Sequence, residues 1–178
     1  MERVHVINIV RQMTANDRLN LELIHRAYKG KFHRGRPEML LMRMTNGRNL
    51  QMFRGGKVQI FGNIGEHEAE SMRLEFIDKL RRILPKIQIS KLTILNMVVG
   101  TNLLRTVPLR NIPSSDKHVF YEVELFPAAL IRKWHPAHIA VFHNGKVIIT
   151  GVKTIPVLSD IVSHLEVYIA HHFPLCTK

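Results

Sequence analysis

The spacing of hydrophobic residues changes along this chain, and each change marks an expected element. Residues 5–13 alternate between apolar and polar, which is typical of a strand with Asn8, Val10 and Gln12 on one face. Asn16 and Asp17 are suitable caps, so a short helix is expected over residues 19–28, followed by a basic loop over 29–37. Strands are then expected over 39–44, 50–53 and 57–61, joined by the turns Asn46-Gly47 and Gly55-Gly56 into an antiparallel meander. In an Asn-Gly turn both residues are expected to adopt positive φ.

After Gly65 the apolar residues recur with a helical period until Pro85, so a long amphipathic helix is expected to pack on this meander. The second half repeats the order, with Asn144-Gly145 as its hairpin turn. It predicts strands over 94–101, 130–132, 139–142 and 146–150, a loop over 106–115, an extended segment over 120–125, and a second helix from Pro156 to Pro174.

Two decamers support an internal duplication. FRGGKVQIFG at residues 53–62 and FHNGKVIITG at residues 142–151 share six residues in one register, 89 positions apart, and Asn8-Ile9-Val10 recurs at Asn96-Met97-Val98 after 88. The period indicates two repeats, 6–91 and 92–175, forming one two-repeat unit. Two such halves side by side would form one antiparallel sheet with helices on one face, and the bare face would be a binding surface.

The charge favours a polyanionic partner. The formal net charge is +12, with 17 basic and 9 acidic residues through Ser90 and 9 and 5 after it, so the charge is spread over the fold. Nucleic acid is the first expectation and an anionic membrane surface the second. A merely soluble basic protein is the plain alternative.

Other classes are disfavoured by what the sequence lacks. No apolar run reaches the length of a membrane span, the first residues are too polar for a signal peptide, and one cysteine, Cys176, excludes an intramolecular disulfide. His135, His138 and His143 lie close together, as do His171 and His172, but no HExxH or paired-cysteine motif accompanies them. We therefore expect no metal, no cofactor and no enzymatic activity.

Several motifs resemble the TATA-binding protein family. In the second half these are YEVELFP at residues 121–127 and Phe142-x-x-Gly-Lys-Val-x-x-Thr-Gly before the long helix. In the first half they are the NIV at Asn8, RLNL at residues 18–21, Met42-Arg43 and FRGGKV at Phe53. The resemblance covers residues 6–173 and implies an α+β saddle: two pseudo-symmetric repeats forming one curved ten-stranded antiparallel sheet, with helices packed on the convex face.

The resemblance also implies roles for individual residues. Members of this family bind the DNA minor groove and insert apolar side chains as wedges that kink the duplex. The matching wedge positions are Phe53, Phe126, Phe142 and Pro37. The groove contacts would be Asn8, Val10, Asn96, Val98, Thr150 and Phe61, and Arg43 and Arg132 would contact phosphates.

Departures from the family pattern fall in the first repeat. Pro37 stands where a phenylalanine wedge is expected, Phe61 replaces the counterpart of Thr150, and Gln12, Gln51 and Gln59 replace smaller or more apolar groove residues. We therefore expect TATA specificity to be relaxed or asymmetric, with the second repeat dominating.

The implied partners are double-stranded promoter DNA, RNA polymerase and a transcription factor B-like protein bound at Glu122, Glu124 and Leu125. A transcription factor A-like protein or other regulators would bind the convex face, where the helix charges Arg73, Lys79, Arg81, Arg82 and Lys86 are candidates. The function implied is a general transcription initiation factor in the nucleus, or in the cytoplasm if the source is archaeal or a cytoplasmic virus. The alternative is a diverged saddle that acts as a protein-interaction or non-specific nucleic-acid-binding regulator without TATA preference.

Overall fold

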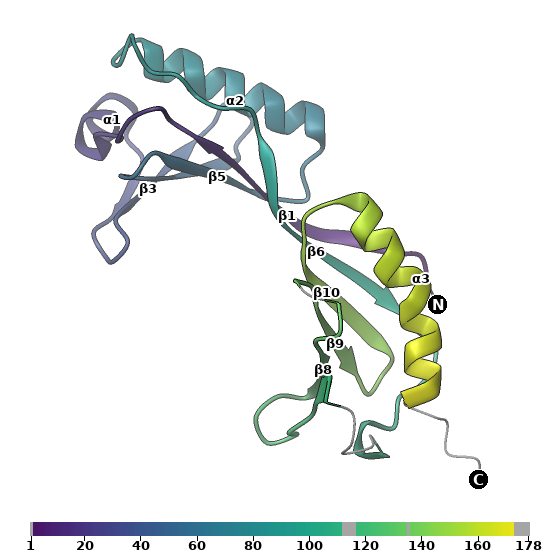
Figure 1. Ribbon diagram of the computed structural model, residues 1–178. Helices are drawn as coiled ribbons and strands as arrows, with labels where there is room; N and C mark the ends of the chain where they lie inside the picture. The colour runs from purple at the N-terminus through teal and green to yellow at the C-terminus, as the bar shows by residue number, and fades with distance from the viewer. Residues whose placement is uncertain (1, 112–116, 135, 173–178) are drawn as a thin grey trace. The chain divides into compact units, whose positions relative to one another are not determined.

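The computed structural model describes residues 2–111, 117–134 and 136–172. Within these ranges the chain forms three α-helices and ten strands (Figure 1), and the strands make one sheet in the order β2-β3-β4-β5-β1-β6-β10-β9-β8-β7. This confirms the expected α+β class and its ten-stranded antiparallel sheet. None of the helices described combines the length and hydrophobicity that crossing a bilayer requires.

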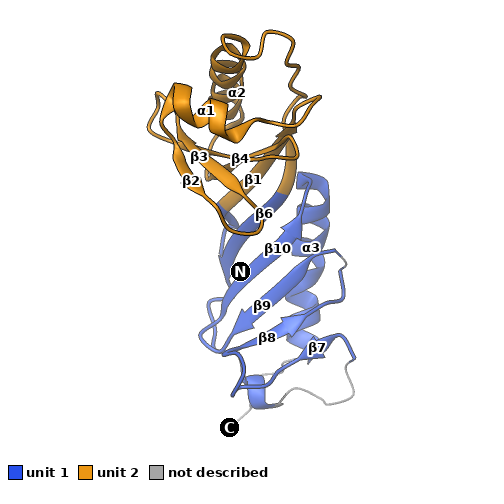
Figure 2. Ribbon diagram, turned by 90° about the vertical axis from the view of Figure 1, so that its left-hand side faces the viewer, with its two compact units in different colours: residues 1–7, 96–178 blue, residues 8–95 orange. Residues whose placement is uncertain are grey.

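The chain divides into two compact units (Figure 2). Unit 2 is Asn8–Leu95, and unit 1 combines residues 1–7 with residues 96–178. Unit 2 thus carries most of the first predicted repeat, and unit 1 carries most of the second. The predicted boundary between residues 91 and 92 stays a prediction.

Unit 2 packs two helices on one face of its strands. Its elements are most of β1 (His5–Thr14), then α1 (Leu21–Tyr28), β2 (Lys31–His33), β3 (Met39–Arg43), β4 (Asn49–Phe53), β5 (Lys57–Gly62) and α2 (Glu66–Arg81). Alternate strand residues such as Leu40, Met52 and Ile60 are buried with Ile24 of α1 and Phe76 of α2. The residues between them lie on the opposite face, which we call the open face.

Unit 1 has the same plan with one helix. Its elements are β6 (Thr93–Asn102), a 3-10 turn (Leu109–Asn111), β7 (Val119–Phe120), β8 (Ala128–Ile131), β9 (His138–Phe142), β10 (Lys146–Val152) and α3 (Ile155–His172). Ile161 and Leu165 of α3 and Val141 and Ile149 of the sheet are fully buried. The helix runs along one side of strands β8 to β10 (Figure 2), which leaves the other side as the open face of unit 1.

The β3–β4, β4–β5 and β9–β10 hairpins use one turn type. In each, the N–H of a glycine bonds to the carbonyl oxygen three residues earlier: Gly47 to Met44, Gly56 to Phe53 and Gly145 to Phe142, at 2.9–3.0 Å. These glycines have φ of 78°, 90° and 84°, whereas Asn46 and Asn144 do not have positive φ. The hairpins are therefore three-residue loops with a glycine bulge, and the expectation of positive φ at both Asn and Gly was wrong.

Four local predictions need correction. Helix α1 begins at Leu21, and its N-cap is Asn20, whose Oδ1 accepts a hydrogen bond from Leu23 N at 3.0 Å. The predicted cap Asn16 has another partner, since its Oδ1 accepts from Gln88 N at 2.9 Å. The basic loop contains strand β2, paired with β3.

Residues 123–125 form a turn instead of an extended segment, and Leu125 N and Phe126 N both bond to Glu122 O. Helix α2 ends at Arg81, before Pro85. Pro174 and residues 112–115 of the predicted loop lie outside the described residues.

Candidate nucleic-acid interface

The open face of unit 2 gathers most of the first-repeat residues that the sequence singles out. Val10 is the cross-strand partner of Phe61, Gln12 of Gln59, and Met39 of Phe53. Phe61 is 41% exposed, and Phe53, Val10 and Asn8 are half-buried. Pro37 is exposed just before β3. The result is an accessible surface of aromatic, aliphatic and amide groups on strands β1, β3, β4 and β5.

The open face of unit 1 carries the second-repeat set. Phe142 is the partner of Ala128, and Thr150 is the partner of His138. Asn96 and Val98 alternate with the buried residues Met97 and Val99, which places them on the open face of β6. Phe126 is 41% exposed, and its ring meets that of Phe142 edge to face, with centroids 6.1 Å apart. Two aromatic rings therefore stand together on this face.

The two predicted groove asparagines are held in the same way in their separate units. Asn8 Oδ1 accepts from the backbone N–H of Gly62, and Asn96 Oδ1 accepts from that of Gly151, both at 2.8 Å. Gly62 and Gly151 end the two repeated decamers, and both have positive φ, 130° and 83°. Because each oxygen is occupied and neither NH₂ group donates to a described residue, each asparagine presents its NH₂ group as a hydrogen-bond donor. The sequence signal for this arrangement was the glycine that closes each decamer.

The two predicted phosphate-contacting arginines are exposed. Arg43 ends β3 opposite Asn49, and Arg132 follows β8. Arg132 lines a surface pocket together with Lys117 and His118, and its backbone N–H bonds to His118 O at 2.9 Å. Lys117 and His118 were not singled out from the sequence. Cationic and imidazole groups around one hollow suit a phosphate oxygen.

The predicted partner-binding residues project from the turn after β7. Glu122 and Glu124 are exposed, Val123 is 55% exposed and Leu125 is 77% exposed. Such an exposed apolar pair flanked by carboxylates is typical of a small docking surface. Sequence analysis named Glu122, Glu124 and Leu125 but missed Val123.

Several carboxylates of unit 2 are neutralised by arginine or lysine. Arg54 bonds to Glu22 at 2.6 Å and Glu38 at 2.7 Å, and its hydrogen bond lowers the pKa of Glu22. Arg73 likewise lowers the pKa of Glu70. Burial opposes a lowered pKa at Glu75, but its hydrogen bonds from Thr45 and Lys79 outweigh burial, so that pKa is also lowered. Paired carboxylates leave the remaining basic residues to set the surface potential.

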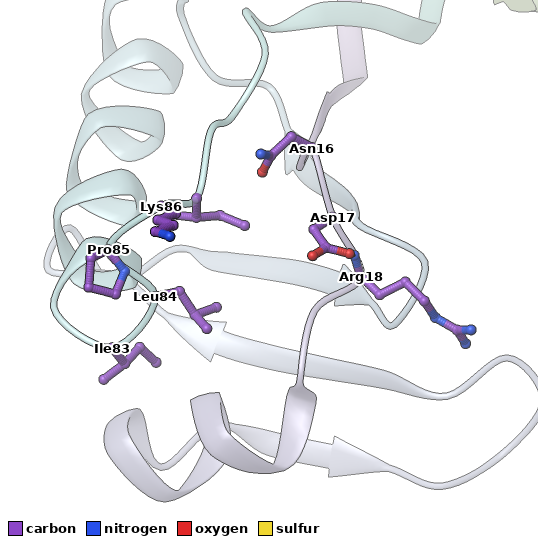
Figure 3. Close-up of a pocket in the computed structure, with 8 residues that line it drawn as sticks. Asn16, Asp17, Arg18, Ile83, Leu84, Pro85 and Lys86 are labelled. Carbon is purple, nitrogen blue, oxygen red and sulfur yellow. The ribbon is translucent and has the colours of Figure 1, made fainter.

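The described part of the chain holds no cluster of metal ligands beside these surfaces. No three His, Cys, Asp or Glu side chains there gather as metal ligands, and His135 and Cys176 lie outside the described residues. A pocket of about 390 Å³ lies between residues 16–18 and residues 83–87 (Figure 3). Asp17 is its sole carboxylate, and it contains none of the predicted DNA contacts. This pocket therefore offers no acid–base pair for catalysis.

The chain is similar in sequence to TATA-binding proteins and a related factor. The family model described as transcription factor TFIID, or TATA-binding protein (TBP), matches residues 3–83 and 91–168. The chain is 29% identical over 171 residues to the TBP-related factor of Drosophila melanogaster, covering 92% of this chain and 73% of that protein. It is 32% identical over 107 residues to the TATA-box-binding protein of Pyrococcus abyssi, covering 59% of this chain and 56% of that protein.

A solved structure agrees in fold. Methanococcus jannaschii TBP superposes with a TM-score of 0.77 at 24% identity, covering 95% of this chain and 99% of that one. The family match spans both halves of the chain, as the internal repeat requires. The chain therefore belongs to the TATA-binding protein family, a family of DNA-binding transcription factors.

Proposed function

We propose that this chain is a general transcription initiation factor that binds and bends A/T-rich promoter DNA through the minor groove. In this proposal both open faces contact one duplex, as the family's two-repeat organisation implies, and the protein recruits transcription factor B and RNA polymerase. We expect the protein to act in the nucleus, or in the cytoplasm if its source is an archaeon or a cytoplasmic virus.

The repeated asparagine–glycine hydrogen bond supports this proposal most strongly. A·T pairs present only the acceptors adenine N3 and thymine O2 in the minor groove. An NH₂ group fixed as a donor matches those acceptors, and Asn8 and Asn96 each offer one beside an aliphatic neighbour, Val10 or Val98. Neither arrangement distinguishes A·T from T·A, so A/T-rich sequence is the expected preference.

The aromatic pair of unit 1 supports DNA bending. Phe126 is 41% exposed and Phe142 is half-buried beside it, and inserting apolar side chains between base steps is how minor-groove proteins kink DNA. In unit 2 the matching positions hold Pro37 and Phe53, a shorter pair. We therefore expect the stronger kink at the end bound by unit 1.

The turn at residues 122–125 supports recruitment of a transcription factor B-like protein. Its carboxylates would steer a basic partner, and Val123 and Leu125 would supply the apolar contact. Replacing Leu125 with Arg should abolish the ternary complex with that factor on DNA without weakening DNA binding. Unchanged ternary complex formation would contradict this assignment.

A gel shift with TATA and scrambled duplexes across a range of salt concentrations tests the proposal as a whole. Preference for TATA that persists at each salt concentration is the expected result. A steep salt dependence without preference would mean phosphate contacts alone, and would favour the alternative of a non-specific nucleic-acid-binding regulator. This alternative is favoured by Gln12, Gln51 and Gln59, which make the open face of unit 2 more polar than the family pattern.

A further inference from the structure

A row of three glutamines crosses the open face of unit 2. Gln12 of β1 pairs with Gln59 of β5, and Gln59 pairs with Gln51 of β4, so the three side chains stand in one cross-strand register. All three are half-buried. We call Gln12, Gln59 and Gln51 the glutamine row.

The same row in unit 1 is apolar. Its members at the repeat spacing are Gly100, Ile148 and Ala140, and they are paired in the same register, Gly100 with Ile148 and Ile148 with Ala140. One internal repeat therefore presents amides where the other presents a glycine and aliphatic side chains. This is a chemical asymmetry at matched positions of one chain.

The contacts of the glutamine row occupy the oxygen of Gln12 and leave the oxygens of Gln51 and Gln59 without a donor among the described residues. Gln59 Nε2 donates to Gln12 Oε1 at 3.2 Å, and Gln51 Nε2 contacts Met39 Sδ at 2.6 Å. Among the described residues nothing donates to Gln59 Oε1 or Gln51 Oε1. The row thus offers two neighbouring carbonyl acceptors on this face.

An acceptor in the minor groove distinguishes base pairs. Adenine N3 and thymine O2 are themselves acceptors, so a glutamine oxygen facing an A·T pair finds no donor. A G·C pair adds the N2 amino group of guanine, which donates to such an oxygen. An apolar row has no acceptor for that amino group and would leave it desolvated and unpaired, which is unfavourable.

We propose that the glutamine row accepts the N2 amino group of guanine, so that the half-site bound by unit 2 accommodates G·C pairs while the half-site bound by unit 1 requires A·T. This inference rests on the proposed minor-groove function. It assigns Gln51 and Gln59 as specificity-determining residues and makes the preferred DNA site asymmetric in composition.

The test adds the amino group alone. In a TATA duplex each adenine is replaced in turn by 2,6-diaminopurine, which carries a guanine-like N2 amino group, and the Kd of the full chain is measured by fluorescence anisotropy. One half-site should tolerate the substitution within about twofold, whereas the other half-site should lose at least about fivefold, the lower range for one unfavourable base pair.

Two exchange variants identify the residues responsible. Gln51→Ala with Gln59→Ile gives unit 2 the side chains of unit 1 and should extend the penalty to both half-sites. The reciprocal Ala140→Gln with Ile148→Gln should remove the penalty from the sensitive half-site. The unfolding midpoint serves as the folding control, and each penalty is expressed relative to the same variant's Kd for the unmodified duplex. The wild-type comparison stands even if a variant fails to fold.

The outcomes separate the two proposals. Tight binding to the unmodified duplex with equal penalties in both half-sites of the wild-type protein would overturn the role of the glutamine row and leave the proposed function standing. Absence of preference for the unmodified TATA duplex would overturn both. A half-site asymmetry that the exchange variants do not move would exclude Gln51 and Gln59 as its cause.

Discussion

Gly151 donates its backbone N–H to Oδ1 of Asn96 at 2.8 Å, at a β-bulge where β10 leaves its register with β6. The bond fixes the orientation of the asparagine amide, and its NH₂ group donates to no described residue. An amide that could present either its oxygen or its NH₂ group to DNA is thereby fixed as a hydrogen-bond donor. Because Asn8 and Gly62 repeat this bond in unit 2, it belongs to the duplicated unit and not to one site.

Two substitutions at Asn96 separate its structural role from its proposed DNA contact. Asn96→Asp keeps an oxygen for the Gly151 N–H but removes the NH₂ donor and adds negative charge, so it should keep most of its stability and lose DNA affinity by roughly tenfold or more. Asn96→Ala should lose both affinity and about 1 kcal/mol of unfolding free energy. Chemical denaturation and anisotropy measure the two effects. Wild-type DNA affinity in Asn96→Asp would exclude the contact.

The predicted wedge pair is testable through bending. Phe142→Ala removes one ring of the 6.1 Å edge-to-face pair and should reduce the kink at one end of a bound duplex, measured by fluorescence energy transfer between end labels. The matched control is Val167→Ala on α3, an exposed apolar residue on the helical side that should leave the kink unchanged. A double-mutant cycle with Phe126→Ala should show coupling, because edge-to-face rings contribute about 0.5–1.5 kcal/mol. An unaltered bend in Phe142→Ala would contradict the wedge assignment.

Arg132 should affect affinity without affecting specificity. Its proposed phosphate contact predicts that Arg132→Ala weakens binding to all duplexes alike and lowers the slope of log K against log salt by about 1. Arg81→Ala, an exposed cation at the end of α2, is the matched control and should leave the slope unchanged. If the loss in Arg132→Ala depended on base sequence instead, the arginine would contact bases.

Glu75 should stabilise the fold at neutral pH and make its stability fall in acid. It binds Thr45 Oγ1 at 2.7 Å and Lys79 at 3.4 Å, which holds the β3–β4 turn on α2. Because its folded pKa lies below the ordinary 4.5, its contribution is complete above that pH and is lost as pH falls through the folded pKa. Glu75→Gln should therefore lower the unfolding free energy by about 1 kcal/mol at neutral pH. Below pH 4.5 the unfolding free energy of the variant should fall less steeply with pH than that of the wild type. If the unfolding free energy of the variant had the same pH dependence as that of the wild type, the contacts of Glu75 with Thr45 and Lys79 would contribute nothing to stability.

The elements that sequence analysis predicted well are those determined by local chemistry. The hairpin glycines at 47, 56 and 145 and the amphipathic stripe of α2 each follow from residues close in the chain. Strand β2 has three residues and no alternation, and it exists because β3 pairs with it. The cap of α1 was predicted at Asn16 or Asp17 and lies at Asn20, and the side chain of Asn16 is instead bonded by a backbone group 72 residues away.

Some features of the candidate site could likewise be predicted from the sequence, and others depend on how the strands pair. The repeat spacing located Asn8, Asn96, Phe53 and Phe142, since duplicated positions stand out in one sequence. The bonds from Gly62 and Gly151, and the free oxygens of the glutamine row, depend on strand register. The hydrogen bonds among them join residues 47 to 55 positions apart, so these features became visible in the structure.

Base substitution with inosine tests whether the open faces recognise the minor groove of A·T pairs. An inosine·cytosine pair presents the minor groove of an A·T pair, because it lacks the N2 amino group, and the major groove of a G·C pair. The Kd for a TATA duplex should stay within about threefold when its A·T pairs are replaced by inosine·cytosine pairs, since a single wrongly read pair already costs about 1–3 kcal/mol. Loss of binding to the inosine duplex, with binding to the parent duplex intact, would place recognition in the major groove and contradict this account.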